Sequence, residues 1–447
     1  MPASQRPDLP AYQPRQADLP LALEGLKVVD FSRVLAGPFG TQILADLGAD
    51  VIKVEDPRCG DSIRAIPPFV DGDSDESTFF ISCNRNKRSI ALDINTPEGR
   101  EVALKLIAWA DVLVENYTSR VMKKAGLDYE SLKAQFPRLI YLSISGYGRT
   151  GPLADAAGLD PVIAAETGVM FMNGLPGQRP GISTVPWVDI TAALNGQVAV
   201  LAALHARDRL GKGQHIDLSM YDSAISDLSY IGGRYLGTGQ VPERYGLYRP
   251  ELVPSGEYDC RDGRPVYVYC MTETHYRRMA VDVFGRPDLV TDYPTFPDRN
   301  VEAEKLQSIF RDLFRSDDAA VIGRKLKACG VPAGVLATLD EGLTSPSAFE
   351  TGMVSQIPHP TLGSVFNVGS PFRKMSLTPA IDPSAAPILG EHSAQVLAEI
   401  GYAPAEVERL VQSGAIRRAA DTGRNAPAFD GETPEPVIAV SGGLDVR

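Results

Sequence analysis

The stretch that decides the fold is residues 26–55, LKVVDFSRVLAGPFGTQILADLGADVIKVE. LKVVDF (26–31) is a short apolar run that predicts a buried strand, and ADVIKVE (49–55) predicts a second one. Between them, GPFGTQILADLG (37–48) places its apolar residues at helical spacing. A strand–helix–strand unit this compact implies two parallel strands joined by a crossover helix.

The same alternation continues along the chain. A strand is expected at 89–94, a helix at 97–110, a strand at 111–116, and a further helix and strand within 131–145. A long helix at 191–211 and a strand at 215–220 follow. Repeated strand–helix units of this kind predict an α/β fold with a Rossmann-like sheet.

The composition and the pattern of expected elements change at several points along the sequence. Residues 1–23 are polar and rich in proline, and they predict an extended arm before the α/β region of 24–225. Short strands and helices then alternate in 226–334, which predicts a smaller α+β domain. Residues 335–416 close with an amphipathic helix pair at 389–413, and 417–447 have the composition of a disordered tail.

Composition limits the function. A net charge of −12 argues against nucleic acid or an anionic membrane as the main partner. The five cysteines lack CxxC spacing, the start lacks the apolar core of a signal peptide, and no apolar run approaches the ~18 residues of a membrane span. We therefore expect a cytoplasmic protein. The basic cluster of Arg85, Lys87 and Arg88 is either a local anion site or a solvated charge run.

Several common chemistries lack their motifs. The glycines of G-x-G-x-x-G are absent after the first strand, so a nucleotide cofactor is not expected. No G-x-S-x-G elbow occurs, and the five histidines are isolated from one another. The sequence therefore predicts neither hydrolase chemistry nor a metal site.

Six segments, in order, resemble the class III CoA-transferase family, which includes formyl-CoA transferase and carnitine CoA-transferase. Beyond the opening stretch they are NRNKRSIALDINTPEGRE (84–101), ADVLVENY (110–117), LSISGYGRTGP (142–152), AALHARDRLGKGQHIDLSMYD (202–222) and LGEH (389–392). The resemblance covers about 24–416. It implies CoA transfer between an acyl-CoA and a carboxylic acid, and an interlocked homodimer whose large domain joins 24–225 to 335–416.

The resemblance assigns the nucleophile to Asp189, in VPWVDITAALNGQ (185–197). Attack on the thioester leads to an aspartyl-CoA thioester, and an acceptor carboxylate then takes the CoA. The thioester energy is kept, so this chemistry needs neither ATP nor a metal. Position alone favours a helix N-cap for Asp189, and the resemblance reverses that order. The two roles are compatible, because nearby backbone N–H groups would stabilise the oxyanion of its adduct.

Further site residues follow from the same resemblance. Asp160 matches a glutamate close to the nucleophile, although a loop aspartate before proline is an equal alternative. Arg58 is a substitute for a family arginine that is Asp56 here. The expected CoA contacts also include Val34, Leu35, Ala36, Leu92, Asp93, Ile94, Asn95, Asn116, Tyr117 and Lys124. Leu35 replaces a family glutamine, so the hydrogen bond of that amide is lost.

Two rival functions remain open. The α-methylacyl-CoA racemases share these motifs, but their catalytic histidine is Leu159 here, and leucine carries no proton. A non-catalytic CoA-binding protein is the third possibility. The glycine-rich loop of formyl-CoA transferase is missing, which favours larger acids such as dicarboxylates or hydroxy acids. Arg234, Arg244 and Arg249 are candidate carboxylate anchors, or ordinary surface arginines.

Overall fold

The computed structural model describes residues 7–16, 18–70, 74, 76–154 and 156–421. These residues form two compact units. The first comprises the chain up to Thr167, Thr184–Ser229 and the chain from Thr344 onward, and the second comprises Gly168–Ser183 and Tyr230–Leu343. The smaller domain expected at 226–334 starts four residues later and ends nine residues later in the structure, and the sequence had placed 168–183 in the large domain.

A seven-stranded sheet forms the centre of the first unit. Its strands are β1 (Lys27–Asp30), β2 (Asp50–Glu55), β3 (Lys87–Leu92), β4 (Val112–Glu115), β5 (Ile140–Ser145), β6 (His215–Ser219) and β12 (Ile416–Arg417). They lie in the order β12-β3-β2-β1-β4-β5-β6, and every pair is parallel except β12 with β3. The order from β3 to β6 is that of a doubly wound Rossmann-type sheet, which confirms the predicted α/β class.

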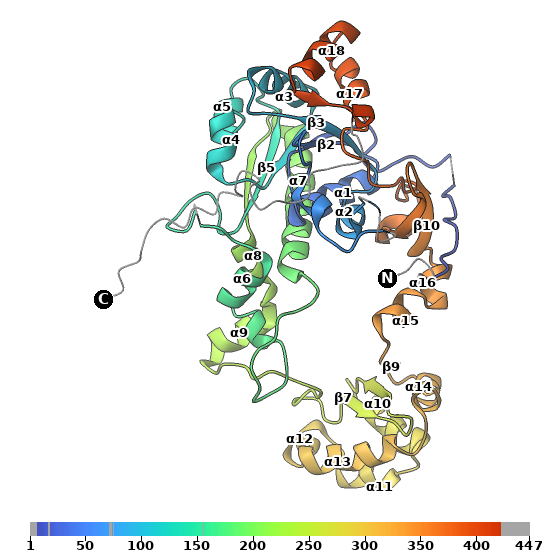
Figure 1. Ribbon diagram of the computed structural model, residues 1–447. Helices are drawn as coiled ribbons and strands as arrows, with labels where there is room; N and C mark the ends of the chain where they lie inside the picture. The colour runs from blue at the N-terminus through green and yellow to red at the C-terminus, as the bar shows by residue number, and fades with distance from the viewer. Residues whose placement is uncertain (1–6, 17, 71–73, 75, 155, 422–447) are drawn as a thin grey trace. The chain divides into compact units, whose positions relative to one another are not determined.

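Helices cover this sheet (Figure 1). The helices of the first unit are α1 (Ala36–Asp46), α2 (Thr78–Cys83), α3 (Pro97–Trp109), α4 (Ser119–Ala125), α5 (Tyr129–Leu132), α6 (Asp160–Glu166), α7 (Trp187–Leu210), α8 (Met220–Asp227), α16 (Pro346–Glu350), α17 (Ser393–Glu399) and α18 (Pro404–Gln412). The core between α3, α17, α18 and the sheet is apolar and closed, with residues such as Val102, Leu106 and Val396 fully buried. The helices expected at 97–110 and 389–413 are therefore confirmed.

Both ends of the chain contribute to the first unit. Ile416 pairs with Leu92 at the edge of the sheet, so the C-terminal segment completes it. The hairpin of β10 (Val354–His359) and β11 (Gly363–Val368) accepts the N-terminal arm, because Ala11 forms a parallel bridge with Gln356. Of the expected tail, Arg417 lies in β12, and the part from 422 onward lies outside the described residues.

The second unit contains a three-stranded antiparallel sheet of β7 (Gly256–Asp259), β8 (Pro265–Val268) and β9 (Ala333–Val335). Its helices are α9 (Ser229–Thr238), α10 (Glu273–Arg277), α11 (Pro287–Asp292), α12 (Phe296–Val301), α13 (Ala303–Phe314), α14 (Ala319–Ala328) and α15 (Leu339–Leu343). The rings of Tyr258 and Phe314 stack at 4.6 Å in its core. Mixed short strands and helices were expected here, and the structure confirms them.

Helix α7 is the longest helix of the described chain. It packs on α1, β5 and β6, and Val188, Ala192, Gly196 and Val200 face that core. By length and composition alone this helix would also suit a membrane span. The expectation that no segment crosses a membrane therefore stays a prediction.

Candidate active site

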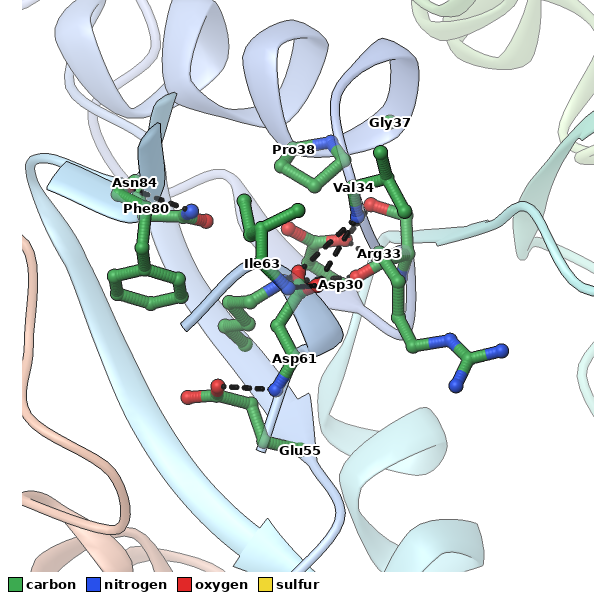
Figure 2. A network of polar contacts seen from close by, with 12 residues as sticks. Asp30, Arg33, Val34, Gly37, Pro38, Glu55, Asp61, Ile63, Phe80 and Asn84 are labelled. Atoms are coloured by element: carbon green, nitrogen blue, oxygen red, sulfur yellow. Dashed lines mark hydrogen bonds and ion pairs between the residues drawn. The ribbon is translucent and has the colours of Figure 1, made fainter. Parts of the chain in front are cut away.

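The turn between β1 and α1 is fixed by a buried carboxylate. Val34 has a φ of 68°, a left-handed conformation that is rare for a β-branched residue. The Val34 N–H donates to both carboxylate oxygens of Asp61, at 3.2 and 3.3 Å, and the Ile63 N–H donates to the same group (Figure 2). Asp61 therefore holds Val34 in place, and Leu35 and Ala36 continue directly into α1.

Opposite charges lie buried beneath this turn. Lys53 pairs with Asp61 at 2.9 Å and donates to the Ser32 carbonyl at 2.8 Å. Glu55 pairs with Arg64 at 2.7 Å. Burial raises the pKa of Glu55, but Arg64 and Lys53 outweigh that effect and lower it to about 2. Separating the members of such a pair would leave an uncompensated buried charge, which costs free energy. The network therefore holds the turn in one conformation.

The end of β4 is joined to the same turn. The Asn116 side chain forms two hydrogen bonds with the Arg33 backbone, accepting from its N–H at 2.8 Å and donating to its carbonyl at 2.7 Å. The Tyr117 N–H donates to Glu115, which is itself paired with Arg149 at 2.6 Å. The structure therefore brings together two of the expected CoA-binding segments, Val34–Ala36 and Asn116–Tyr117.

These two segments follow the carboxyl ends of β1 and β4, the neighbouring strands at which the strand order reverses. In doubly wound sheets, ligands bind in the crevice at this point because the connections diverge to opposite faces. Arg33 also lies here, and sequence reasoning missed it. Its guanidinium carbon lies 4.4 Å from the centre of the Tyr117 ring, and no described residue accepts a hydrogen bond from its side chain. A basic residue directly before Val34 was the available signal.

The other expected CoA contacts are more dispersed. Leu92 ends β3, and Asp93, Ile94 and Asn95 follow it, two strands away from β1. Arg58 is engaged with Asp56 at 2.6 Å. Lys124 is exposed on α4. All of them lie at or after the carboxyl ends of strands, but no hydrogen bond or ion pair between described side chains joins them to the Val34 turn.

The basic cluster at 85–88 has a structural role. Arg85 pairs with Asp46 at 2.5 Å, and buried Lys87 pairs with Asp30 at 3.1 Å. Arg88 pairs with two carboxylates, those of Asp50 and Glu399. Neither expected alternative is correct, because these cations are neutralised inside the protein and are neither an anion site nor a solvated run.

Asp189 lies in the first turn of α7, as its third residue, and it does not cap the helix. Pro186 is the N-cap residue and has no capping side chain. The cap comes from Asp160, whose Oδ2 accepts from the N–H groups of Val188 at 2.9 Å and Asp189 at 3.2 Å. Asp160 thus accepts from two of the backbone N–H groups nearest Asp189, and the expectation that such groups stabilise an oxyanion stays a prediction.

Two glycines place Asp160. A Cβ on Gly158 would lie 2.5 Å from the Cα of Gly146, a distance that real Cβ atoms do not show. The loop after β5 therefore folds back so that the backbone at Gly158 touches the backbone at Gly146. Only two glycines permit so close an approach. Asp160 follows two residues later, at the start of α6.

The carboxyl group of Asp189 is the reactive feature of this region. Burial, and then the negative charge of Asp160, raise its pKa to about 7. No described residue donates a hydrogen bond to its oxygens, in contrast to the saturated carboxylate of Asp61. A half-buried carboxylate with a raised pKa and free lone pairs is a better nucleophile than an ordinary aspartate.

Helix α1 connects the two parts of the site. At Gly40 it touches α7, because an added Cβ would lie 2.4 Å from Nε2 of Gln197 and 3.4 Å from the carbonyl of Ala193. Ala193 is one helical turn after Asp189. The described residues contain no group of three or more His, Cys, Asp or Glu that could hold a metal ion, and the expectation of metal-free chemistry stays a prediction.

Comparison with known proteins shows the family. The family model described as CoA-transferase family III matches residues 23–393. The chain belongs to this family. It is 34% identical over 400 residues to succinyl-CoA:glutarate CoA-transferase of Mus musculus, covering 89% of this chain and 90% of that protein. It is 37% identical over 388 residues to succinyl-CoA:mesaconate CoA-transferase of Haloarcula hispanica, covering 85% and 96%.

A solved structure has the same fold. A CaiB/BaiF family protein from Brucella suis is 36% identical, with a TM-score of 0.76, over 85% of this chain and all of that one. Membership of CoA-transferase family III makes this chain a CoA-transferase, as its sequence predicted. It moves CoA between an acyl-CoA and a carboxylic acid.

Proposed function

We propose that this enzyme transfers CoA from a dicarboxylyl-CoA, such as succinyl-CoA, to a dicarboxylic acid through a thioester on Asp189. The observation that carries the proposal is the Asp189 carboxyl group, half-buried, unpaired and with its pKa raised to about 7. Relatives named for succinyl-CoA with glutarate, mesaconate and malate support the substrate class.

The reaction divides into balanced exchanges. An oxygen of Asp189 attacks the donor thioester, the C–S bond breaks, and CoA leaves as thiolate from a mixed anhydride. The thiolate attacks the aspartyl carbonyl and releases the donor acid, which leaves aspartyl-CoA. The acceptor carboxylate attacks this thioester and releases thiolate again. The thiolate then takes the acceptor acyl group and restores Asp189. Covalent catalysis thus replaces one difficult exchange with easier steps.

CoA would occupy the crevice at the strand-order reversal. Val34–Ala36 and Asn116–Tyr117 line its two sides, and Arg33 offers a free guanidinium for a phosphate group. Asp160 is a positioning residue, because it acts on Asp189 through the helix backbone and through its charge. Leu159 is 59% exposed and cannot exchange a proton, so the racemase alternative gains no support.

We further propose an interlocked homodimer in the cytoplasm. One face of α7 carries apolar side chains that the single chain leaves uncovered, with Trp187 54% and Val198 67% exposed. A second copy would cover this face. The described cysteines are all free thiols, which suits a reducing compartment.

The transfer itself is tested with succinyl-CoA and a panel of glutarate, mesaconate, malate, oxalate, pentanoate and butyrate. Mass spectrometry of the thioesters should show new dicarboxylyl-CoA products, with succinate released in equal amount. Loss of succinyl-CoA to free CoA alone would indicate a thioesterase instead. No turnover with any acid would favour a CoA-binding protein.

A further inference from the structure

Asp61 is a fully buried carboxylate with several protein partners (Figure 2). Its oxygens accept from the N–H groups of Val34 and Ile63. One of them also lies 2.9 Å from Nζ of Lys53, and the Asp61 backbone N–H donates to Glu55 at 3.1 Å. The side chains of Asp61 and Lys53 are 0% and 1% exposed, so these partners replace the water that a surface aspartate would bind.

One of these contacts is local and another is not. Asp61 is the N-cap residue of the short 3₁₀ helix Ser62–Ala65, and the hydrogen bond from Ile63 fulfils that role. Val34, by contrast, lies 27 residues earlier in the chain, in the turn between β1 and α1. A helix cap needs no such partner, so the hydrogen bond from Val34 indicates a second role for Asp61.

The peptide unit between Arg33 and Val34 is held at both ends. Its carbonyl, on Arg33, accepts from the Asn116 side chain at 2.7 Å. Its N–H, on Val34, donates to Asp61. Because the peptide is planar and α1 begins at Ala36, the orientation of this peptide relative to the helix sets φ of Val34. The bond to Asp61 therefore stabilises the observed φ of 68°, which a β-branched residue otherwise avoids.

The charge of Asp61 is balanced inside the protein. Burial lowers the pKa of Lys53, but Asp61 and Asp30 outweigh that effect and raise it, so Lys53 stays a cation. A hydrogen bond from a backbone N–H to a carboxylate is roughly twice as strong as one to a neutral acceptor. A carboxylate at position 61 therefore restrains the turn more than an amide or a hydroxyl would.

We propose that Asp61 is a positioning residue for acyl-CoA binding: it holds Val34 in the left-handed conformation before CoA arrives. The turn that carries Arg33 is then already formed. This rests on the placement of CoA beside the turn in the proposed function. Because Asp61 is fully buried, it acts without touching CoA. It sets the fraction of molecules whose turn is competent to bind, and that fraction scales the apparent affinity.

Asp61→Ala tests this by calorimetric titration with free CoA. Without the carboxylate, the steric cost of the left-handed conformation should weaken CoA binding about 5- to 30-fold. Asp61→Asn keeps one acceptor oxygen and should give an intermediate Kd. In the transfer assay, the KM for succinyl-CoA should rise by the same factor, while kcat and the KM for glutarate change little.

Asp46→Ala is the matched control. Asp46 is also a buried carboxylate, paired with Arg85 at 2.5 Å, and it lies at the other end of α1. Its loss should lower stability, as the loss of Asp61 does, but leave the Kd for CoA unchanged. A similar loss of CoA binding in both variants would show a general effect of stability and overturn the proposal.

A second substitution shows whether Asp61 acts through Val34. Glycine adopts the left-handed conformation without a steric cost, so it does not need the carboxylate. Val34→Gly added to Asp61→Ala should therefore tighten CoA binding relative to Asp61→Ala alone. A double variant that binds CoA no more tightly than Asp61→Ala would overturn the proposal, because the two residues would then act independently.

Arg33→Gln separates this proposal from the proposed function. If Arg33→Gln weakens CoA binding and folded Asp61→Ala does not, CoA lies in the crevice but Asp61 does not position the turn. If neither variant weakens it, the placement of CoA in the crevice is wrong as well.

Hydrogen exchange of the wild type needs no variant. The Val34 amide should be protected before CoA is added, and it should gain little further protection from CoA. A Val34 amide that exchanges freely until CoA binds would overturn the proposal, since the turn would not be formed in advance.

Discussion

Asp160 caps the helix that carries Asp189: its Oδ2 lies 2.9 Å from the Val188 nitrogen and 3.2 Å from the Asp189 nitrogen. One carboxylate therefore acts on the other in two ways. Through the backbone it fixes where α7 begins, and through its charge it raises the pKa of Asp189, after burial. The two effects can be separated by substitution.

Asp160→Asn keeps a capping oxygen and removes the charge. Because burial remains, the pKa of Asp189 should fall from about 7 but stay above its ordinary value. The acid limb of kcat/KM for the acyl-CoA should then move to lower pH. Asp160→Ala should shift the limb similarly and also lose ~1 kcal/mol of stability, because it removes the cap. An acid limb that stays in place in both variants would show that Asp160 has no electrostatic effect.

The stability of Asp189→Asn should depend on pH. The pKa of Asp189 is about 7 in the folded state and near the ordinary aspartate value of 3.8 in the unfolded state, so the folded state binds this proton more tightly. Ionising Asp189 therefore costs stability, a cost absent below about pH 4 and complete above about pH 7. Denaturant unfolding should show the variant gaining stability over the wild type across this range. A constant difference would contradict the raised pKa.

Val34 stores strain in the turn that lines the proposed CoA crevice, since its φ is 68°. Val34→Gly relieves that strain and Val34→Ala does not. The glycine variant should therefore be more stable than the alanine variant by ~1 kcal/mol. Its freer turn should nevertheless raise the KM for acyl-CoA. Thermal unfolding and initial rates measure the two effects. Equal stability of the two variants would mean that Asp61 imposes no strain on the turn.

The proposed interlocked dimer should not dissociate on dilution, because separating linked chains requires unfolding. The uncovered apolar side chains of α7, such as Trp187 and Val198, motivate this expectation. Sedimentation at nanomolar concentration should give twice the mass of one chain. A folded monomer at that concentration would contradict interlocking.

Local patterns in the sequence predicted the sheet well. The strands expected at 26–31, 49–55 and 111–116 lie within two residues of β1, β2 and β4, because each is a short apolar run with a clear end. The resemblance to the family supplied Asp189, which position alone would have assigned to a helix cap.

Contacts between distant segments were not predictable in this way. Nothing local links Asp160 to the N–H of Asp189, which lies 29 residues later in the chain. The cluster at 85–88 looked solvent-facing because its partners, among them Asp46 and Asp50, belong to other elements. Arg249 looked like any surface arginine until the structure showed that its Nε is buried and has no hydrogen-bond partner in the described part of the chain.

The central claim is that Asp189 carries CoA. The wild type, incubated with succinyl-CoA and quenched, should gain the mass of CoA on the peptide that contains Asp189. Hydroxylamine should convert this thioester to a hydroxamate at the same residue. Asp189→Asn should show no adduct and a fall in transfer of several orders of magnitude, while Asp160→Asn should still form the adduct. An adduct on Asp160, or full activity of Asp189→Asn, would contradict the mechanism.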